Sequence, residues 1–158
     1  MRADDLAAVL HGHDAVLSAL GTRGLGTTSV LVDSARASIE AMQRTGVRRL
    51  IVISSSLVDK QSGWLSLVAA RTLLRHTASD QRAMEKLVTQ SELDWTVLRP
   101  ALLSDGVLTG RYAVSPASAG ILASRAALSR EDVAHMMLDA TERGAYAKEI
   151  VWLRGAGA

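Results

Sequence analysis

Four nearly continuous apolar runs in the sequence predict buried β-strands. They lie at 14–21, 49–53, 95–99 and 149–153, and Pro100 is expected to stop the third because proline has no amide hydrogen to donate. A strand that is apolar on successive residues is covered on both faces. These runs therefore indicate an α/β fold, a parallel sheet between layers of helices, with 1–158 forming a single domain.

Apolar residues at helical spacing predict helices around the first two strands. Asp4 or Asp5 can cap a short helix before the first strand, and Thr27 or Thr28 can cap a long one after it, which Gly46 ends. The apolar side of the long helix carries Leu31, Ala35, Ile39 and Met42.

The second half of the chain holds three more predicted helices and one irregular stretch. Two helices are expected at 64–75 and 79–91, and Ser129 opens the last one through a capping-box variant with Asp132 at its third position. Glycines and a proline interrupt 101–123. This stretch is therefore predicted to be a loop region with one short strand near 112–114.

Composition and charge narrow the functional classes. The net charge is only +2 and the basic residues are scattered, so no surface resembles a nucleic-acid or anionic-membrane site. Aromatic residues make up 3%, too few for a base-stacking platform. With no cysteine and no histidine pair at H-x-x-x-H spacing, no metal site is predicted. No apolar run reaches membrane-spanning length, and we expect a cytoplasmic protein.

Ligands bind beyond the carboxyl ends of the strands in open parallel sheets. The loop at 21–26 precedes a helix, where amides, the helix dipole and Arg23 favour a phosphate or another anion; a flexible connection is the alternative. Ser54, Ser55 and Ser56 follow the second strand, either as donors to a substrate carbonyl or as caps of the strand end. No G-x-S-x-G elbow supports a nucleophilic serine.

Four segments, read in order, resemble one known family. They are 12–23 (GHDAVLSALGTR), 46–55 (GVRRLIVISS), 93–100 (LDWTVLRP) and 108–112 (LTGRY). Together they resemble the atypical short-chain dehydrogenase/reductases of the NAD(P)H-binding type, such as flavin reductases and biliverdin-IXβ reductases, which are related to NmrA-like proteins. The resemblance covers nearly all of the chain and implies a Rossmann-like sheet.

The resemblance also implies a cofactor, an acceptor and a set of site residues. The cofactor is NADP or NAD, with NADP favoured by the family, and hydride passes to a small-molecule acceptor, namely a flavin, quinone or tetrapyrrole. Such a site places two rings face to face, and its proton can come from solvent. By position, Ser55 would be catalytic, and the cofactor would contact Ala19, Leu20, Gly21, Thr22, Arg23, Ser54, Pro100, Ala101 and Leu102.

The chain departs from the family pattern in two places. Thr77 and Gln81 stand where ordinary short-chain reductases have a proton-donating Tyr and its Lys partner, which disfavours an ordinary carbonyl reductase. Family members also begin with a strand, a Gly-x-x-Gly-x-x-Gly turn, a helix and another strand. The sequence starts after these elements, so we expect an N-terminally incomplete fold.

The missing elements would leave the strand at 15–20 as a sheet edge with unpaired amides. We expect the isolated chain to form a homo-oligomer through this edge, to pair with the missing piece, or to be only marginally stable. Two alternatives to a reductase stay open. One is a non-catalytic, NmrA-like dinucleotide-binding or regulatory module, and the other is an inactive truncated fragment.

Overall fold

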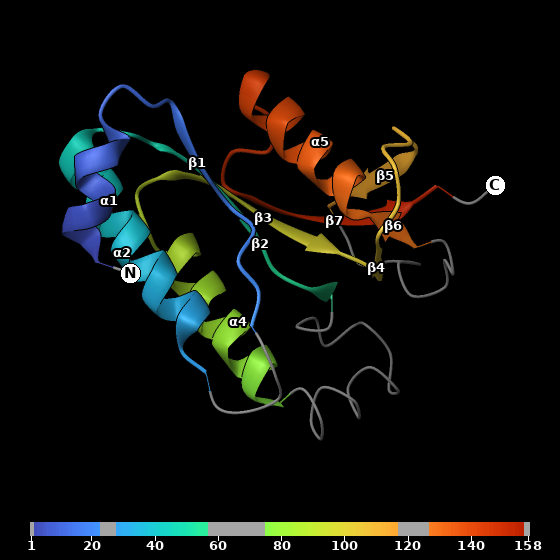
Figure 1. The fold of residues 1–158 in the computed structure, drawn as a ribbon, viewed down its shortest axis with the longest axis horizontal. Helices are drawn as coiled ribbons and strands as arrows, with labels where there is room; N and C mark the ends of the chain where they lie inside the picture. The colour runs from blue at the N-terminus through green and yellow to red at the C-terminus, as the bar shows by residue number, and fades with distance from the viewer. Residues whose placement is uncertain (1, 23–27, 57–74, 117–126, 157–158) are drawn as a thin grey trace.

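A computed structural model describes residues 2–22, 28–56, 75–116 and 127–156. Strands and helices alternate along most of the chain (Figure 1). The helix predicted at 64–75 lies outside the described residues, except for Arg75, where α4 begins. The elements are α1 (Ala3–Leu10), β1 (Ala15–Ser18), α2 (Val30–Thr45), β2 (Arg49–Ile53), α4 (Arg75–Thr89), β3 (Asp94–Pro100), β4 (Leu103–Ser104), β5 (Tyr112–Ser115), β6 (Leu128–Ser129), α5 (Arg130–Glu142) and β7 (Glu149–Gly155).

The central sheet has five strands in the order β1-β2-β3-β7-β5. The first four are parallel, as predicted from their apolar runs, and pairs such as Leu50 and Trp95 define their register. β5 pairs antiparallel with β7, so the sheet is mostly rather than wholly parallel. β4 and β6 form a separate two-stranded parallel sheet.

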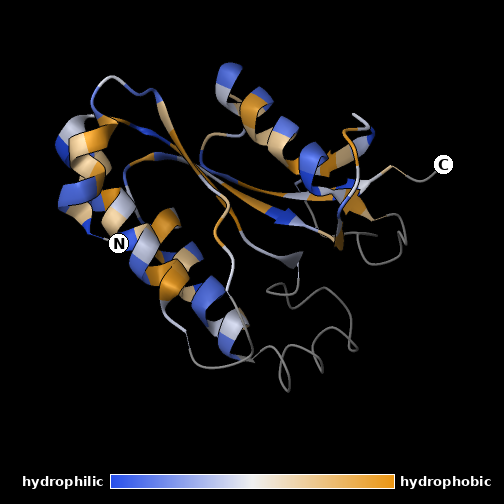
Figure 2. Cartoon of the chain, viewed as in Figure 1, coloured by the Kyte–Doolittle hydropathy of each residue, from blue (hydrophilic) through white to orange (hydrophobic). Residues whose placement is uncertain are grey.

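Successive residues of the central strands point to opposite faces and enter two separate cores. Leu50 and Val52 of β2 pack with α1, α2 and α4, whereas Ile51 packs with α5. Figure 1 shows the three helices on one side of the sheet and α5 on the other, and Figure 2 shows hydrophobic residues concentrated between these layers. Burial on both faces explains the continuous apolar runs. In the described part of the chain, no helix is both long and apolar enough to span a membrane.

The helix ends agree with the predicted signals at two positions and differ at two others, the start of α1 and the start of α2, where Ser29 rather than Thr28 is the N-cap. Gly46 ends α2 with a φ of 79°, a left-handed conformation that glycine adopts without steric cost. Ser129 caps α5 and accepts a hydrogen bond from the amide of Asp132 at 2.9 Å. The predicted caps Asp4 and Asp5 are wrong, because α1 begins before them and both acids lie inside its first turn.

Three of the four predicted central strands differ in length from the prediction, and one of them is β7, which continues to Gly155 instead of ending at Leu153. β1 ends at Ser18, so the residues that follow it already belong to a connection at the sheet rim. β3 does not stop before Pro100 but includes it, opposite Leu153 of β7. The next amide, that of Ala101, donates to the Leu153 carbonyl at 2.8 Å. The chain therefore stays attached to β7 where it leaves the sheet.

β1 lies at an open end of the sheet, which confirms the expected edge. Within the described residues, no strand pairs with its outer side, and the side chain of Leu17 is 38% exposed. Association of the chain through this edge stays a prediction.

A buried ion pair attaches α4 to β3. Arg99 donates two hydrogen bonds to Glu85, at 3.0 and 2.7 Å, and its guanidinium carbon lies 5.0 Å from the ring centre of Trp152 on β7. Removing one partner of such a buried pair costs about 3–5 kcal/mol. The pair therefore determines where Gln81, one turn before Glu85, lies relative to Pro100, the neighbour of Arg99.

Candidate active site

A large pocket opens at the carboxyl ends of β1, β2 and β3. Its volume is about 610 Å³, which falls within the range of about 300–1,000 Å³ typical of small-molecule sites. Strand ends, one residue of α4 and one face of α5 form its walls. The described residues that line it are Ala19, Leu20, Gly21, Ile53, Ser54, Ser55, Ser56, Gln81, Pro100, Ala101, Leu102, Leu103, Arg130, Val133, Ala134 and Met137.

Eight of the ten predicted site residues line this pocket. Thr22 does not line it, and its hydroxyl lies 3.2 Å from that of Thr77 on α4. Arg23 lies outside the described residues. Their roles in catalysis and in cofactor binding stay predictions. The eight that meet here are Ala19, Leu20, Gly21, Ser54, Ser55, Pro100, Ala101 and Leu102.

The serines that follow β2 differ in their surroundings. Ser54 is only 5% exposed, and its amide donates to the carbonyl of Leu98 at 2.7 Å. Its hydroxyl is buried and has no hydrogen-bond partner among the described residues. A buried polar group without a partner costs about 1–3 kcal/mol, and a polar ligand atom would supply the missing bond once the Ser54 side chain rotates toward the pocket. The structure thus points to Ser54, whereas the sequence favoured its neighbour Ser55 as the catalytic residue.

Two parts of the pocket wall were missed as site residues. Gln81 of α4 was noted only as a departure from the family pattern. α5 contributes one face to the wall. The sequence indicated only that this face is buried in the core, because Val133 and Met137 are apolar and four residues apart on a helix. The sequence could not show that the same helix face lines the pocket as well as the core. The four wall residues of α5 are Arg130, Val133, Ala134 and Met137.

The start of α2 is occupied by a carboxylate of the chain itself. Asp80 of α4 accepts hydrogen bonds from the amides of Leu31 and Val32, each at 3.1 Å. The predicted cap Thr28 binds only the amide of Val30, at 3.2 Å. Asp80 therefore satisfies two of the amides that the helix start leaves open. Most of the loop at 21–26, where an anion site was predicted, lies outside the described residues, and that site stays a prediction.

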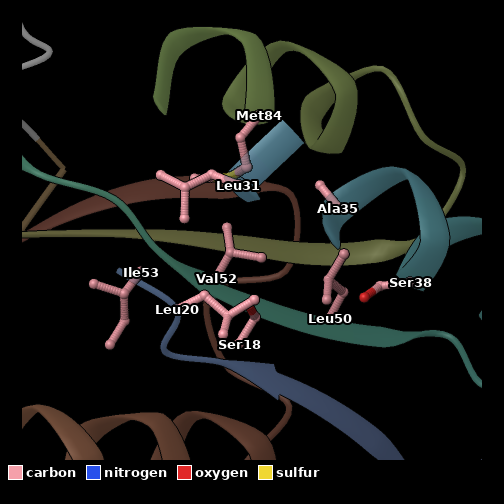
Figure 3. A pocket seen from close by; sticks show the side chains of 9 residues that line it. All are labelled: Ser18, Leu20, Leu31, Ala35, Ser38, Leu50, Val52, Ile53 and Met84. Carbon is pink, nitrogen blue, oxygen red and sulfur yellow. The ribbon is translucent and has the colours of Figure 1, made fainter. Parts of the chain in front are cut away.

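A second cavity lies between α2, α4 and the strands β1 and β2 (Figure 3). Its volume is about 10 Å³, close to the minimum that a single water molecule needs. Figure 3 shows Leu31, Ala35 and Met84 of the helices above Leu50 and Val52 of β2. This space is a gap in the core packing and is too small for a substrate or cofactor.

The large pocket is almost free of ionisable side chains. Among its described lining residues, Arg130 alone carries a charge, and none is a carboxylate or a histidine. No group of His, Asp or Glu in the described part of the chain is arranged to hold a metal ion. Its side chains can therefore position and hydrogen-bond a ligand, but they supply no carboxyl or imidazole for general acid–base catalysis.

Asp132 ties the loop before β5 to the start of α5. Its carboxylate is 2% exposed and accepts hydrogen bonds from the Thr109 amide, the Thr109 hydroxyl and the Gly110 amide, at 2.9, 2.8 and 2.8 Å. Burial by itself raises the pKa of Asp132, but hydrogen bonding with Ser129, Thr109 and Gly110 outweighs burial and lowers it. The segment 108–112, noted above for its family resemblance, therefore helps to hold the α5 wall of the pocket.

Comparisons with known proteins agree with this description. Residues 1–143 match the family model described as NAD(P)H-binding. The chain is 27% identical over 139 residues to an uncharacterised sugar epimerase of Bacillus subtilis, covering 85% of this chain and 60% of that protein. The chain thus spans about three fifths of the length of the curated relatives it matches.

Solved structures share the fold at low sequence identity. A short-chain dehydrogenase/reductase of Veillonella parvula in complex with NADP has a TM-score of 0.75 and 18% identity, covering 98% of this chain and 69% of that chain. The anaerobillin reductase of Escherichia coli O157:H7 has a TM-score of 0.74 and 20% identity, covering 99% and 72%. Both agree with a Rossmann-type fold for this chain. The chain therefore belongs to the NAD(P)H-binding family.

Proposed function

We propose that this chain forms part of an NAD(P)H-dependent reductase that passes hydride to a planar small molecule, such as a flavin, quinone or tetrapyrrole. The observation that carries the proposal is the pocket at the strand ends, where the buried hydroxyl of Ser54 has no partner. Its volume of about 610 Å³ suits an aromatic ring together with part of a second one. Family membership supports the cofactor, and the NADP complex of a structural neighbour favours NADP over NAD.

The residues present fit the nicotinamide end of the cofactor. Pro100 and Ala101 supply an apolar wall for a ring, and Gly21 has open space where a side chain would stand. The hydroxyl of Ser54 can donate to a carbonyl or accept from an amide, and the nicotinamide carboxamide offers both. When bound, the cofactor supplies the hydride. Ser55, which also lines the pocket, is placed by this proposal beside the reacting rings.

The chain's own contribution to catalysis is positional. Apolar side chains from β3 and α5 exclude water from part of the pocket and hold planar molecules against one another. None of the described lining residues has a carboxylate or imidazole that could donate a proton. A reaction that fits this wall transfers hydride to an acceptor whose proton comes from solvent.

The lack of a proton donor among the described wall residues also favours a second candidate, a non-catalytic dinucleotide-binding module. Thr77 stands at the position of the usual tyrosine, and its hydroxyl lies beside that of Thr22 rather than in the pocket wall. Gln81, at the position of the usual lysine, lines the pocket without carrying a charge. Such a chain would bind the cofactor and leave it unreacted.

A fluorescence titration with NADPH tests the proposal on the whole 158-residue chain. Saturable binding, followed by NADPH oxidation when a flavin or quinone is added, is the result expected of a reductase. Binding without oxidation supports the module, and no binding at millimolar NADPH contradicts both functions for this chain. Ser55→Ala is expected to lower kcat more than affinity, and an unchanged kcat would remove Ser55 from the mechanism.

Ser54→Ala gives a sharper test because two measurements should move in opposite directions. The variant loses a ligand hydrogen bond of about 1.4 kcal/mol, so the Kd for NADPH should rise about tenfold. It also removes a buried unpaired hydroxyl, so the melting temperature of the free protein should stay equal or rise. Ser91→Ala, which removes a hydroxyl bonded to the Val88 carbonyl at the far end of α4, is the control and should leave NADPH affinity unchanged.

A further inference from the structure

The charge on the pocket wall is concentrated in one side chain. Of the described lining residues, only Arg130 is ionised at neutral pH, and its neighbours on the same wall, Val133, Ala134 and Met137, are apolar. A helix face with one cation at its start and apolar side chains along its length suits an amphipathic ligand. The planar body of such a ligand would lie on the apolar part, and an anionic group would meet the guanidinium.

The present partner of Arg130 holds it only weakly. Its guanidinium forms an ion pair with Asp105, but the two side chains are 59% and 94% exposed. An ion pair this exposed contributes about 0–1 kcal/mol, so a ligand anion can compete for the arginine. An arginine binds a carboxylate or phosphate through two parallel hydrogen bonds, which gives such a contact both energy and direction.

The acidic residues that follow Arg130 on α5 do not cancel this charge inside the pocket. Glu131 accepts a hydrogen bond from the amide of Leu108 at 2.6 Å, and Asp132 accepts three from Thr109 and Gly110. Both carboxylates are engaged by the loop before β5, and neither lines the pocket. The positive end of the α5 dipole lies at the same place, but the two first-turn carboxylates partly offset it, so the attraction for an anion rests on the guanidinium of Arg130.

The geometry points to Arg130 as the residue that selects the hydride acceptor: the pocket takes planar acceptors that carry a carboxylate or phosphate group in preference to neutral ones. This inference rests on the proposed reductase function and adds the chemical class of its substrate. Uncharged quinones then become poor acceptors, whereas flavin phosphates and tetrapyrroles with free propionates become good ones.

Matched pairs of probes test the inference by direct binding, without any turnover. Flavin mononucleotide and riboflavin share one ring system and differ by a phosphate, while biliverdin and its dimethyl ester differ by their free carboxylates. Each pair is titrated against the whole chain by fluorescence quenching. The charged member is expected to bind about tenfold more tightly in at least one pair, a difference of about 1.4 kcal/mol. The pair that shows the preference identifies the anion.

Arg130→Gln should abolish that preference by weakening only the charged probe, and Arg130→Lys should keep part of it, because lysine retains the charge without the planar fork. Arg143→Gln is the matched control: it removes an exposed arginine at the other end of α5, whose Nε lies 2.8 Å from Asp139. Arg143→Gln should change the affinity for neither the charged nor the uncharged probe. Circular dichroism melts of all three variants check that they are folded.

Three results would overturn the inference. Equal binding, or no binding, of both members in both pairs shows that the pocket does not select anions. Unchanged affinity of Arg130→Gln for the charged probe shows that another residue does. A loss of NADPH affinity in Arg130→Gln assigns the arginine to the cofactor instead of the acceptor. A preference for charged probes without NADPH oxidation would contradict the reductase proposal and leave the anion selectivity intact.

Discussion

α2 and α5 both begin on the side of the sheet where the parallel strands end, but their first turns are stabilised differently. α5 is capped from within its own segment, because Ser129 accepts the amide of a residue only three positions ahead, Asp132. α2 is capped by another helix, because Asp80 of α4 accepts the amides of Leu31 and Val32 from 49 and 48 positions away. Both solutions satisfy amides that a helix start leaves open.

The difference affects how the two helices depend on the rest of the fold. The cap of α5 forms wherever its short segment becomes helical, so it supports the helix before the tertiary structure is complete. Apart from the local bond between the Val30 amide and the Thr28 hydroxyl, the cap of α2 exists only when α4 is already packed beside it. The residue after Asp80 is Gln81, which lines the pocket. The hydrogen bonds between Asp80 and the start of α2 therefore also help to position this part of the candidate site.

The largest effect is expected for Asp80→Ala. It leaves two helix amides without their partner, one of them buried, and we expect the free energy of unfolding to fall by about 3 kcal/mol. Urea denaturation followed by circular dichroism measures the change. Asp33→Ala, which removes an exposed acid from the first turn of the same helix, is the control and should cost less than about 1 kcal/mol. Equal losses in the two variants would show that the long-range cap contributes nothing beyond local charge.

A smaller and pH-dependent effect is expected for Asp132→Asn. The variant weakens the hydrogen bonds to Thr109 and Gly110, and the loss should be about 2 kcal/mol at neutral pH. Because folding lowers the pKa of Asp132, its contribution is present above the unfolded pKa of about 4 and is lost as the pH falls through the folded value. The free energies of unfolding of the unmodified protein and of Asp132→Asn should therefore converge as the pH falls below about 4. A difference that stays constant with pH would contradict the ionised role of this carboxylate.

The smallest effect is expected for Ser129→Ala, the local cap of α5. Loss of a serine cap typically costs about 1 kcal/mol, and the remaining first turn can be hydrated. Combining it with Asp132→Asn should cost less than the sum of the two single changes, because both act on one hydrogen-bonded group. If Ser129→Ala lowered the free energy of unfolding more than Asp80→Ala does, the local cap of α5 would contribute more than the long-range cap of α2, contrary to this expectation.

The site could be predicted from the sequence where it depends on strand ends. Leu20, Ser54 and Pro100 line the pocket because parallel strands place their carboxyl ends along one edge, whereas Ala19 was expected from the family resemblance alone. The unpaired hydroxyl of Ser54 could not be predicted in preference to that of Ser55. Their difference in burial depends on surrounding elements far away in the chain, not on the identity of the residue.

What the sequence alone determined about this protein is periodic or local: the parallel strands, the helix end at Gly46 and the cap at Ser129. These features follow from short continuous apolar runs, glycine conformation and neighbouring hydrogen-bond partners, which act over a few residues. Only the tertiary structure decided that Asp80 occupies the start of α2 and that Arg130 lines the pocket. Both depend on how whole helices pack against the sheet, and this packing is a sum of many contacts that no local pattern records.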